Sequence, residues 1–374
     1  MRIFLGIIGC VLALAILLDV FRVVVLARRA QGEFRFTYLF YRLTWPFFVR
    51  VGRRIQSGRR REAFLGIYGP LSLLLLFFTW AMGFVLGFTF LQLSAASTVE
   101  ISRNFPEAFY LSAASFLTIG TGNSQHEFSR WISVAEAGIG YSFLALVIGY
   151  LPVFYQSFAR RELHISMLDA RAGSPPAAAE LLSREGKYPS QLERQLAAWE
   201  EWAADLLQDE LSYPMLAYFR SQHLNQSWIG ALVAIADTSA LISLSAKDEL
   251  RHQAEATFAM ARHALTDSAK VLKLEPEHNA EDRLSSADFG KLQQIITNCG
   301  SLNGGMLKKE EVVRLRALYE PYSFALSSHL LMALPSWIPE RSSSDNWRLT
   351  SKRTQSTYAV SDPFHDGDKK DRSA

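Results

Sequence analysis

The chain has 374 residues, 49% of them hydrophobic, and a net charge of +3 at pH 7. This length allows two or three domains. Long apolar runs dominate the part before about residue 158 and charge returns after it, so the composition excludes a uniformly water-soluble chain. Cys10 lies in an apolar run and Cys299 in the polar half. No disulfide is expected between them, and the polar half is interpreted as cytosolic.

Residues 1–28 are predicted to form an N-terminal transmembrane helix. A cleaved signal peptide is the alternative, because Met1 and Arg2 make a short charged start. The apolar run is long, however, and no small-residue cleavage site precedes its arginines. Asp19 and Arg22 interrupt the run, and their spacing lets them pair on one helix face. The other interpretation of Asp19 is a functional acid inside the membrane.

Residues 29–63 are rich in arginine and in aromatic side chains. Arginine beside a membrane segment resists translocation, so this loop is expected in the cytoplasm. The composition favours a helix in the headgroup layer, broken in two at Trp45-Pro46. Its position between two membrane segments argues against nucleic-acid binding. Contacts with anionic lipids are expected at Arg50, Arg53, Arg54, Arg59, Arg60 and Arg61.

Residues 64–160 contain two further membrane-length runs around a short segment. The outer helix is expected at residues 65–93 and the inner helix at residues 132–158. The inner helix ends shortly before Arg160-Arg161. Both groups of arginines then lie inside, with the N-terminus outside. The chain is therefore predicted to be a multi-pass protein of the plasma or inner cell membrane.

A short helix is predicted at residues 105–117, entering the membrane from the outside. Asn104 stands at the cap position, Pro106 fits the first turn, and Glu107 places a negative charge near the positive end of the helix.

Residues 118–122 follow this helix and read Thr-Ile-Gly-Thr-Gly. Glycine adopts a positive φ at no steric cost. We expect Gly120 and Gly122 in that region, and Thr118, Ile119 and Thr121 outside it. Successive carbonyls would then point the same way and form the coordination shell of a dehydrated cation.

This stretch resembles the pore loop of potassium channels, whose filter reads Thr-Val-Gly-Tyr-Gly followed by Asp. The matching positions are Thr118, Ile119, Gly120 and Gly122. The resemblance covers roughly residues 65–161. It implies a homotetramer that conducts K⁺ passively, with the filter on the symmetry axis and K⁺ at the carbonyls of Thr118, Ile119, Gly120 and Thr121. No enzymatic activity and no cofactor besides the permeant ion are expected.

Two positions depart from the potassium-channel pattern. Thr121 replaces the Tyr, and it is too small to span the gap that an aromatic ring would fill behind the filter. Asn123 replaces the Asp and removes a charge at the outer mouth. The alternatives are therefore a weakly selective monovalent cation channel, or a non-conducting membrane anchor for a helical interaction domain.

Three positions in the inner helix are candidate functional residues. Glu136 lies near the level of the filter, where a charged carboxylate is costly unless it is paired or protonated. It either braces the filter or the short helix by hydrogen bonding, or it is an interfacial acid that reaches water. Gly138 and Gly140 are possible gating hinges, or they allow close helix packing.

Residues 161–340 are predicted to form an α-helical cytosolic domain. Helices are expected at residues 191–211, 247–272, 287–298 and 308–334, the last bent near Pro321. Residues 228–244 are apolar, with Asp237 near the centre, and form either a buried helix or another span. Residues 341–374 are expected to be a disordered tail. The whole is an all-α membrane protein with three transmembrane helices, one re-entrant pore helix with a filter loop, and this cytosolic domain.

Overall fold

The computed structural model describes residues 2–26, 36–55, 58–95, 104–120, 127–222, 225–300, 302 and 307–339. These residues form helices and contain no strand, which confirms the all-α prediction for this part of the chain. The described residues all belong to one compact unit, which ends at residue 340. The predicted disordered tail lies outside the described residues, as do residues 29–35 of the basic segment.

Within the described part of the chain, four helices are long and apolar enough to cross a membrane. They are α1 (Arg2–Val20) with its π-helical continuation η1 (Phe21–Val25), α3 (Gly58–Ala95), α5 (Glu127–Ala172) and α8 (Trp228–Ser245). The fourth differs from the others because 94% of its apolar window is buried inside the protein. This burial favours the predicted buried helix over another span.

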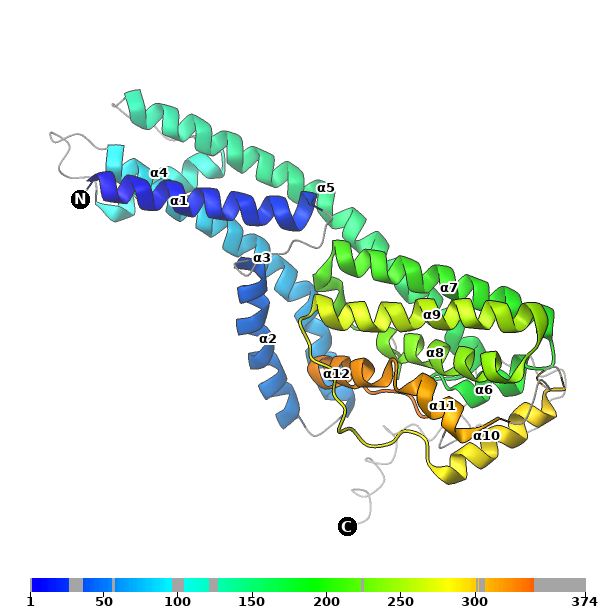
Figure 1. Ribbon diagram of the computed structural model, residues 1–374. Helices are drawn as coiled ribbons and strands as arrows, with labels where there is room; N and C mark the ends of the chain where they lie inside the picture. The colour runs from blue at the N-terminus through cyan, green and yellow to red at the C-terminus, as the bar shows by residue number, and fades with distance from the viewer. Residues whose placement is uncertain are drawn as a thin grey trace, which may run out of the picture. The chain divides into compact units, whose positions relative to one another are not determined.

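Helices α1 and α3 pack side by side and run antiparallel (Figure 1). The contact uses glycines, as close helix packing in membranes requires. A Cβ added at Gly9 would lie 2.5 Å from the carbonyl oxygen of Gly87, and one at Gly83 would lie 2.8 Å from the Ile16 side chain. The start of α1 therefore lies beside the end of α3.

The partners of Asp19 differ from the expected one. Its carboxylate accepts hydrogen bonds from the Thr37 backbone N–H at 3.2 Å, the Thr37 hydroxyl at 2.6 Å and the Trp80 indole N–H at 2.9 Å. Asp19 is 4% exposed and does not pair with Arg22. The carboxylate instead lies at the N-terminus of α2 (Phe36–Arg54), where backbone N–H groups lack helical partners.

Helix α2 continues through Pro46, so the expected break at Trp45-Pro46 is wrong. The aromatic side chains of α2 pack against distant parts of the chain. The Tyr41 ring stacks on that of Tyr218 with centroids 4.9 Å apart, and the Trp45 indole N–H donates to the His329 carbonyl at 2.9 Å.

Helices α3 and α5 are both longer than expected. The former begins at Gly58 and contains Pro70, and the latter runs without a break from Glu127 to Ala172. The 46 residues of α5 span about 69 Å, more than twice the roughly 30 Å hydrocarbon core, so part of this helix must lie outside a membrane. The predicted boundary at residue 161 falls within this helix.

The helices after α5 form a bundle in which α6, α7, α9, α11 and α12 pack on α8, and α10 packs on α6 (Figure 1). They are α6 (Ala178–Glu185), α7 (Pro189–Ser212), the 3₁₀ helix η2 (Pro214–Tyr218), α9 (Asp248–Val271), α10 (Ser286–Asn298), α11 (Lys309–Arg316) and α12 (Glu320–Leu330). The helix expected at residues 308–334 is two helices. Pro321 lies in the first turn of α12, where its missing N–H has no cost, and does not bend a continuous helix.

Asp237, the acid near the centre of α8, is neutralised inside this group of helices. The Arg283 guanidinium lies 2.6 Å from its carboxylate and 2.9 Å from that of Glu320, and the Tyr319 hydroxyl donates to Asp237 as well. All four side chains are at most 10% exposed. The ion pairs connect α8 to α12, and they explain how an apolar helix tolerates a buried acid.

Candidate functional site

The short helix α4 (Phe105–Phe116) lies between α3 and α5. Its 12 residues span about 18 Å, too little to cross a hydrocarbon core of roughly 30 Å. Pro106 lies in its first turn and Glu107 beside its N-terminus, whereas the Asn104 side chain makes no capping hydrogen bond. The helix ends one residue before the predicted end at residue 117.

A polar contact joins all three helices. The Ser112 hydroxyl of α4 lies 2.8 Å from the Val85 carbonyl oxygen of α3 and also contacts the Glu136 carboxylate of α5. Glu136 is 0% exposed, so it does not reach water in the single chain. Its second oxygen, Oε2, has no hydrogen-bond partner among the described residues.

A second polar contact joins α3 to α5 alone. The Gln92 side-chain amide donates to the Ser133 hydroxyl at 3.0 Å, and the Ser129 hydroxyl donates to Gln92 Oε1 at 2.6 Å. We did not predict roles for Ser112 or Gln92 from the sequence. Each of these two residues is a polar residue inside an apolar run. This pattern marks the residue as unusual, but it does not identify the group to which the residue bonds.

The segment after α4 does not begin with the backbone conformation expected for it. Thr118 has a φ of +55°, so the expectation that it lies outside the left-handed region is wrong. The Thr118 N–H donates to the Ser115 carbonyl at 3.0 Å and the Ile119 N–H to the Ala114 carbonyl at 2.9 Å. These two bonds form a Schellman motif, which requires a left-handed residue directly after the C-cap Leu117.

Gly120 has a φ of +83°, in the region expected for it. The predicted site residues Thr121, Gly122 and Asn123 lie outside the described residues. Thr118 and Gly120 are exposed, and the Ile119 side chain is 69% exposed in the single chain.

The two candidate hinge glycines have different surroundings. Gly138 is exposed, and an added Cβ would meet nothing within 4 Å. Gly140 is buried, and an added Cβ would lie 2.0 Å from the Phe116 carbonyl oxygen at the end of α4. Helix α5 continues through both positions. Gly140 therefore allows a close approach of α5 to α4.

The arginines predicted to contact anionic lipids lie at the end of α2 and the start of α3. All six are exposed: Arg50, Arg53, Arg54, Arg59, Arg60 and Arg61.

We compared the chain with protein-family models, with curated proteins and with solved structures. None of the three comparisons found a match.

Proposed function

We propose that the chain is one subunit of a homotetrameric channel that conducts monovalent cations passively, with potassium as the preferred ion. The observation that carries the proposal is α4, a helix too short to cross a membrane, held between two helices long enough to do so. Its C-terminal end leads into the exposed residues 118–120.

One chain supplies one strip of carbonyl groups, so a closed ring needs about four chains. The strip comprises residues 118–122, with ion contacts from the carbonyls of Thr118, Ile119, Gly120 and Thr121. The C-terminal end of α4, which carries roughly half a negative charge, favours a cation nearby. Assembly would also cover apolar side chains that are exposed in one chain, among them Leu117 and Ile119.

The left-handed Thr118 sets a condition on this proposal. In the single chain its N–H and that of Ile119 terminate α4. A conducting filter requires the Thr118 carbonyl to turn towards the axis when the four chains assemble. Relief of a left-handed β-branched residue, which costs on the order of 1–3 kcal/mol, favours that change.

The proposed role of Glu136 is to hold α4 against α5. A hydroxyl has one proton, so Ser112 donates either to the Val85 carbonyl or to Glu136. A protonated Glu136 carboxyl can donate to the Ser112 oxygen, and both contacts are then hydrogen bonds. A neutral acid also suits a buried site without a cationic partner.

The proposed orientation has the N-terminus outside and residues 161–340 in the cytoplasm of a cell-membrane protein. It is supported by the exposed arginines of α2 and α3 and by the antiparallel order of α1 and α3.

The test is the reversal potential of the purified protein in bilayers with mixed K⁺ and Na⁺. Gly120→Ala should abolish the current, because alanine is strained at a φ of +83°. Gly66→Ala, at an open position of α3, is the matched control. Equal permeability to both ions favours the weakly selective channel. A lack of current from correctly inserted wild-type protein favours the non-conducting anchor.

A further inference from the structure

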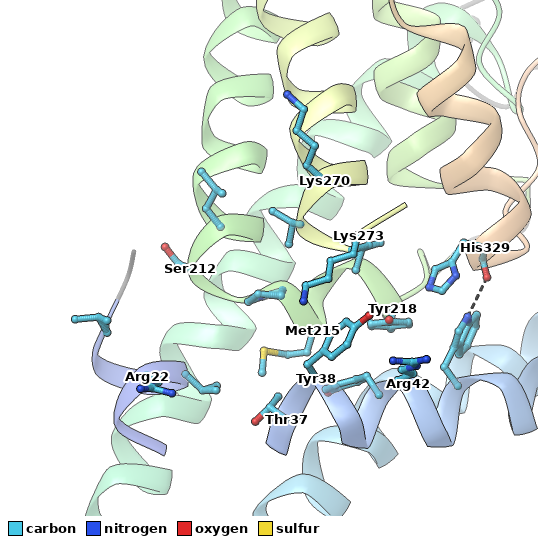
Figure 2. A pocket seen from close by; sticks show the side chains of 18 of the residues that line it. Arg22, Thr37, Tyr38, Arg42, Ser212, Met215, Tyr218, Lys270, Lys273 and His329 are labelled. Atoms are coloured by element: carbon cyan, nitrogen blue, oxygen red, sulfur yellow. Dashed lines mark hydrogen bonds between the residues drawn. The ribbon is translucent and has the colours of Figure 1, made fainter. Parts of the chain in front are cut away.

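A cavity of about 350 Å³ lies where η1 and α2 meet η2 and the ends of α7 and α9 (Figure 2). Four cationic side chains line it: Arg22, Arg42, Lys270 and Lys273. The lining residues include no aspartate or glutamate within the described part of the chain. The cavity is therefore positively charged.

Three of these cations are not neutralised by a carboxylate. Arg22 and Arg42 have no ion pair or hydrogen bond with any of the residues that the structure describes. The Lys273 ammonium lies 4.3 Å from the centroid of the Tyr38 ring, and Figure 2 shows it reaching towards that ring. Lys270 pairs with Asp267 at 3.1 Å and points away from Tyr38. These three cations come from η1, from α2 and from the turn after α9, and all three line the same cavity.

The rest of the lining is largely apolar and aromatic, with Leu26, Trp45, Met215 and Tyr218 among its members. On the η1 side the apolar surface continues out of the cavity, where Val25 is 57% exposed and Leu26 39% exposed. The cavity thus joins a positively charged end to an exposed apolar surface at the end of a membrane-length helix. An amphiphile with an anionic head matches both parts.

We propose that this cavity binds the phosphate-bearing headgroup of an anionic membrane lipid, whose acyl chains lie along η1. The guanidinium groups of Arg22 and Arg42 can each bind a phosphate through two parallel hydrogen bonds, and Lys273 adds a point charge. A soluble phosphate ester carries the same head chemistry, but it would leave the apolar walls uncovered. None of the six arginines at the end of α2 and the start of α3 lines this cavity.

Binding is expected to stabilise the contacts of η2, which forms one wall of the cavity. The Arg161 guanidinium of α5 donates to the Leu216 carbonyl at 2.9 Å and to the Phe219 carbonyl at 2.7 Å. The Phe219 ring lies so close to α3 that a Cβ added at Gly69 would be 2.8 Å from it. A ligand that contacts Met215 would therefore stabilise η2, which is bonded to α5 and packed against α3. Binding should raise the melting temperature of the protein.

The test is a titration of the full chain in neutral detergent with dioctanoyl phosphatidic acid. Dioctanoyl phosphatidylcholine and glycerol 3-phosphate are the comparison probes. The wild type is expected to bind phosphatidic acid most tightly and to melt at a higher temperature with it. Equal binding of phosphatidylcholine would overturn the anionic specificity. Equal binding of glycerol 3-phosphate would identify a soluble ester as the ligand and overturn the lipid proposal. The readout is binding, so it does not depend on whether the protein conducts ions.

The variants separate this cavity from diffuse attraction to basic residues. Arg42→Gln with Lys273→Gln should weaken binding of phosphatidic acid about tenfold or more, and Arg22→Gln, on a separate element, should weaken it too. The matched control is Arg50→Gln with Arg53→Gln, which removes the same charge from exposed positions of α2 outside the cavity. Unchanged binding by the cavity variants, or equal weakening by both pairs, would refute the assignment. Circular dichroism checks that all variants keep the helical content of the wild type.

Discussion

The contact between Gly140 and α4 gives the sharpest prediction from this structure. Gly140→Ala adds one methyl group to α5 at the point where it meets the last turn of α4. The nearest atoms to the new Cβ would be the Phe116 carbonyl oxygen at 2.0 Å, its carbonyl carbon at 2.8 Å and its Cα at 3.1 Å. All three are backbone atoms, so no side-chain rotation can relieve the clash.

The magnitude follows from the distances. Ordinary contact begins at 3.4 Å, so the methyl group and the Phe116 oxygen must separate by about 1.4 Å. Overpacking of this kind typically costs about 1–3 kcal/mol, and the greater preference of alanine for helices offsets at most about 1 kcal/mol of it. The displaced turn leads directly into Thr118, so the geometry of residues 118–120 must change as well.

The assay is thermal unfolding in detergent together with ion flux in liposomes. Gly138→Ala is the control, since it adds the same methyl group to the same helix in open space. We expect Gly140→Ala to lower the melting temperature and the flux, and Gly138→Ala to leave the flux unchanged and the stability equal or higher. Equal stability of the two variants would refute the packing argument. Loss of gating in Gly138→Ala alone would favour a hinge at Gly138.

Three further predictions concern buried polar groups. Burial raises the pKa of Glu210 from 4.5 to about 7. Between these two pH values the folded state is protonated at Glu210 and the unfolded state is not. The free energy of unfolding therefore falls by roughly 3 kcal/mol as the pH rises through this window. Glu210→Gln should remove this pH dependence. If the free energies of unfolding of the variant and the wild type differ by the same amount at every pH between about 5 and 8, the raised pKa of Glu210 is contradicted. Arg283→Met should cost about 3–5 kcal/mol by leaving Asp237 unpaired, and adding Asp237→Leu should recover most of it in chemical denaturation. Trp80→Phe removes the 2.9 Å bond to Asp19 and should lower stability by about 1–3 kcal/mol, so a melting temperature equal to that of the wild type would exclude a structural role for this bond.

Periodicity and composition predicted most of the helices. The helices expected at residues 191–211, 247–272 and 287–298 are α7, α9 and α10, with ends that differ by at most two residues. A repeat of 3.6 residues is a local property of the chain, and proline and capping residues mark the helix ends locally as well. Burial of the 228–244 segment was less certain from sequence, because a buried helix and a membrane span share the same apolar composition.

Sequence by itself determined the all-helical class, the apolar segments long enough to cross a membrane and the short segment between two of them, because these depend on neighbours within a few turns. Only the tertiary structure decided the partners of the polar groups. Asp19 bonds to Trp80, 61 residues away, and Trp45 to His329, 284 residues away. Thr118 takes its left-handed conformation from the termination of α4 and not from the glycines that follow. The physical reason is that a buried polar group is satisfied by whichever partner the packing brings within reach, and local sequence does not encode that distance.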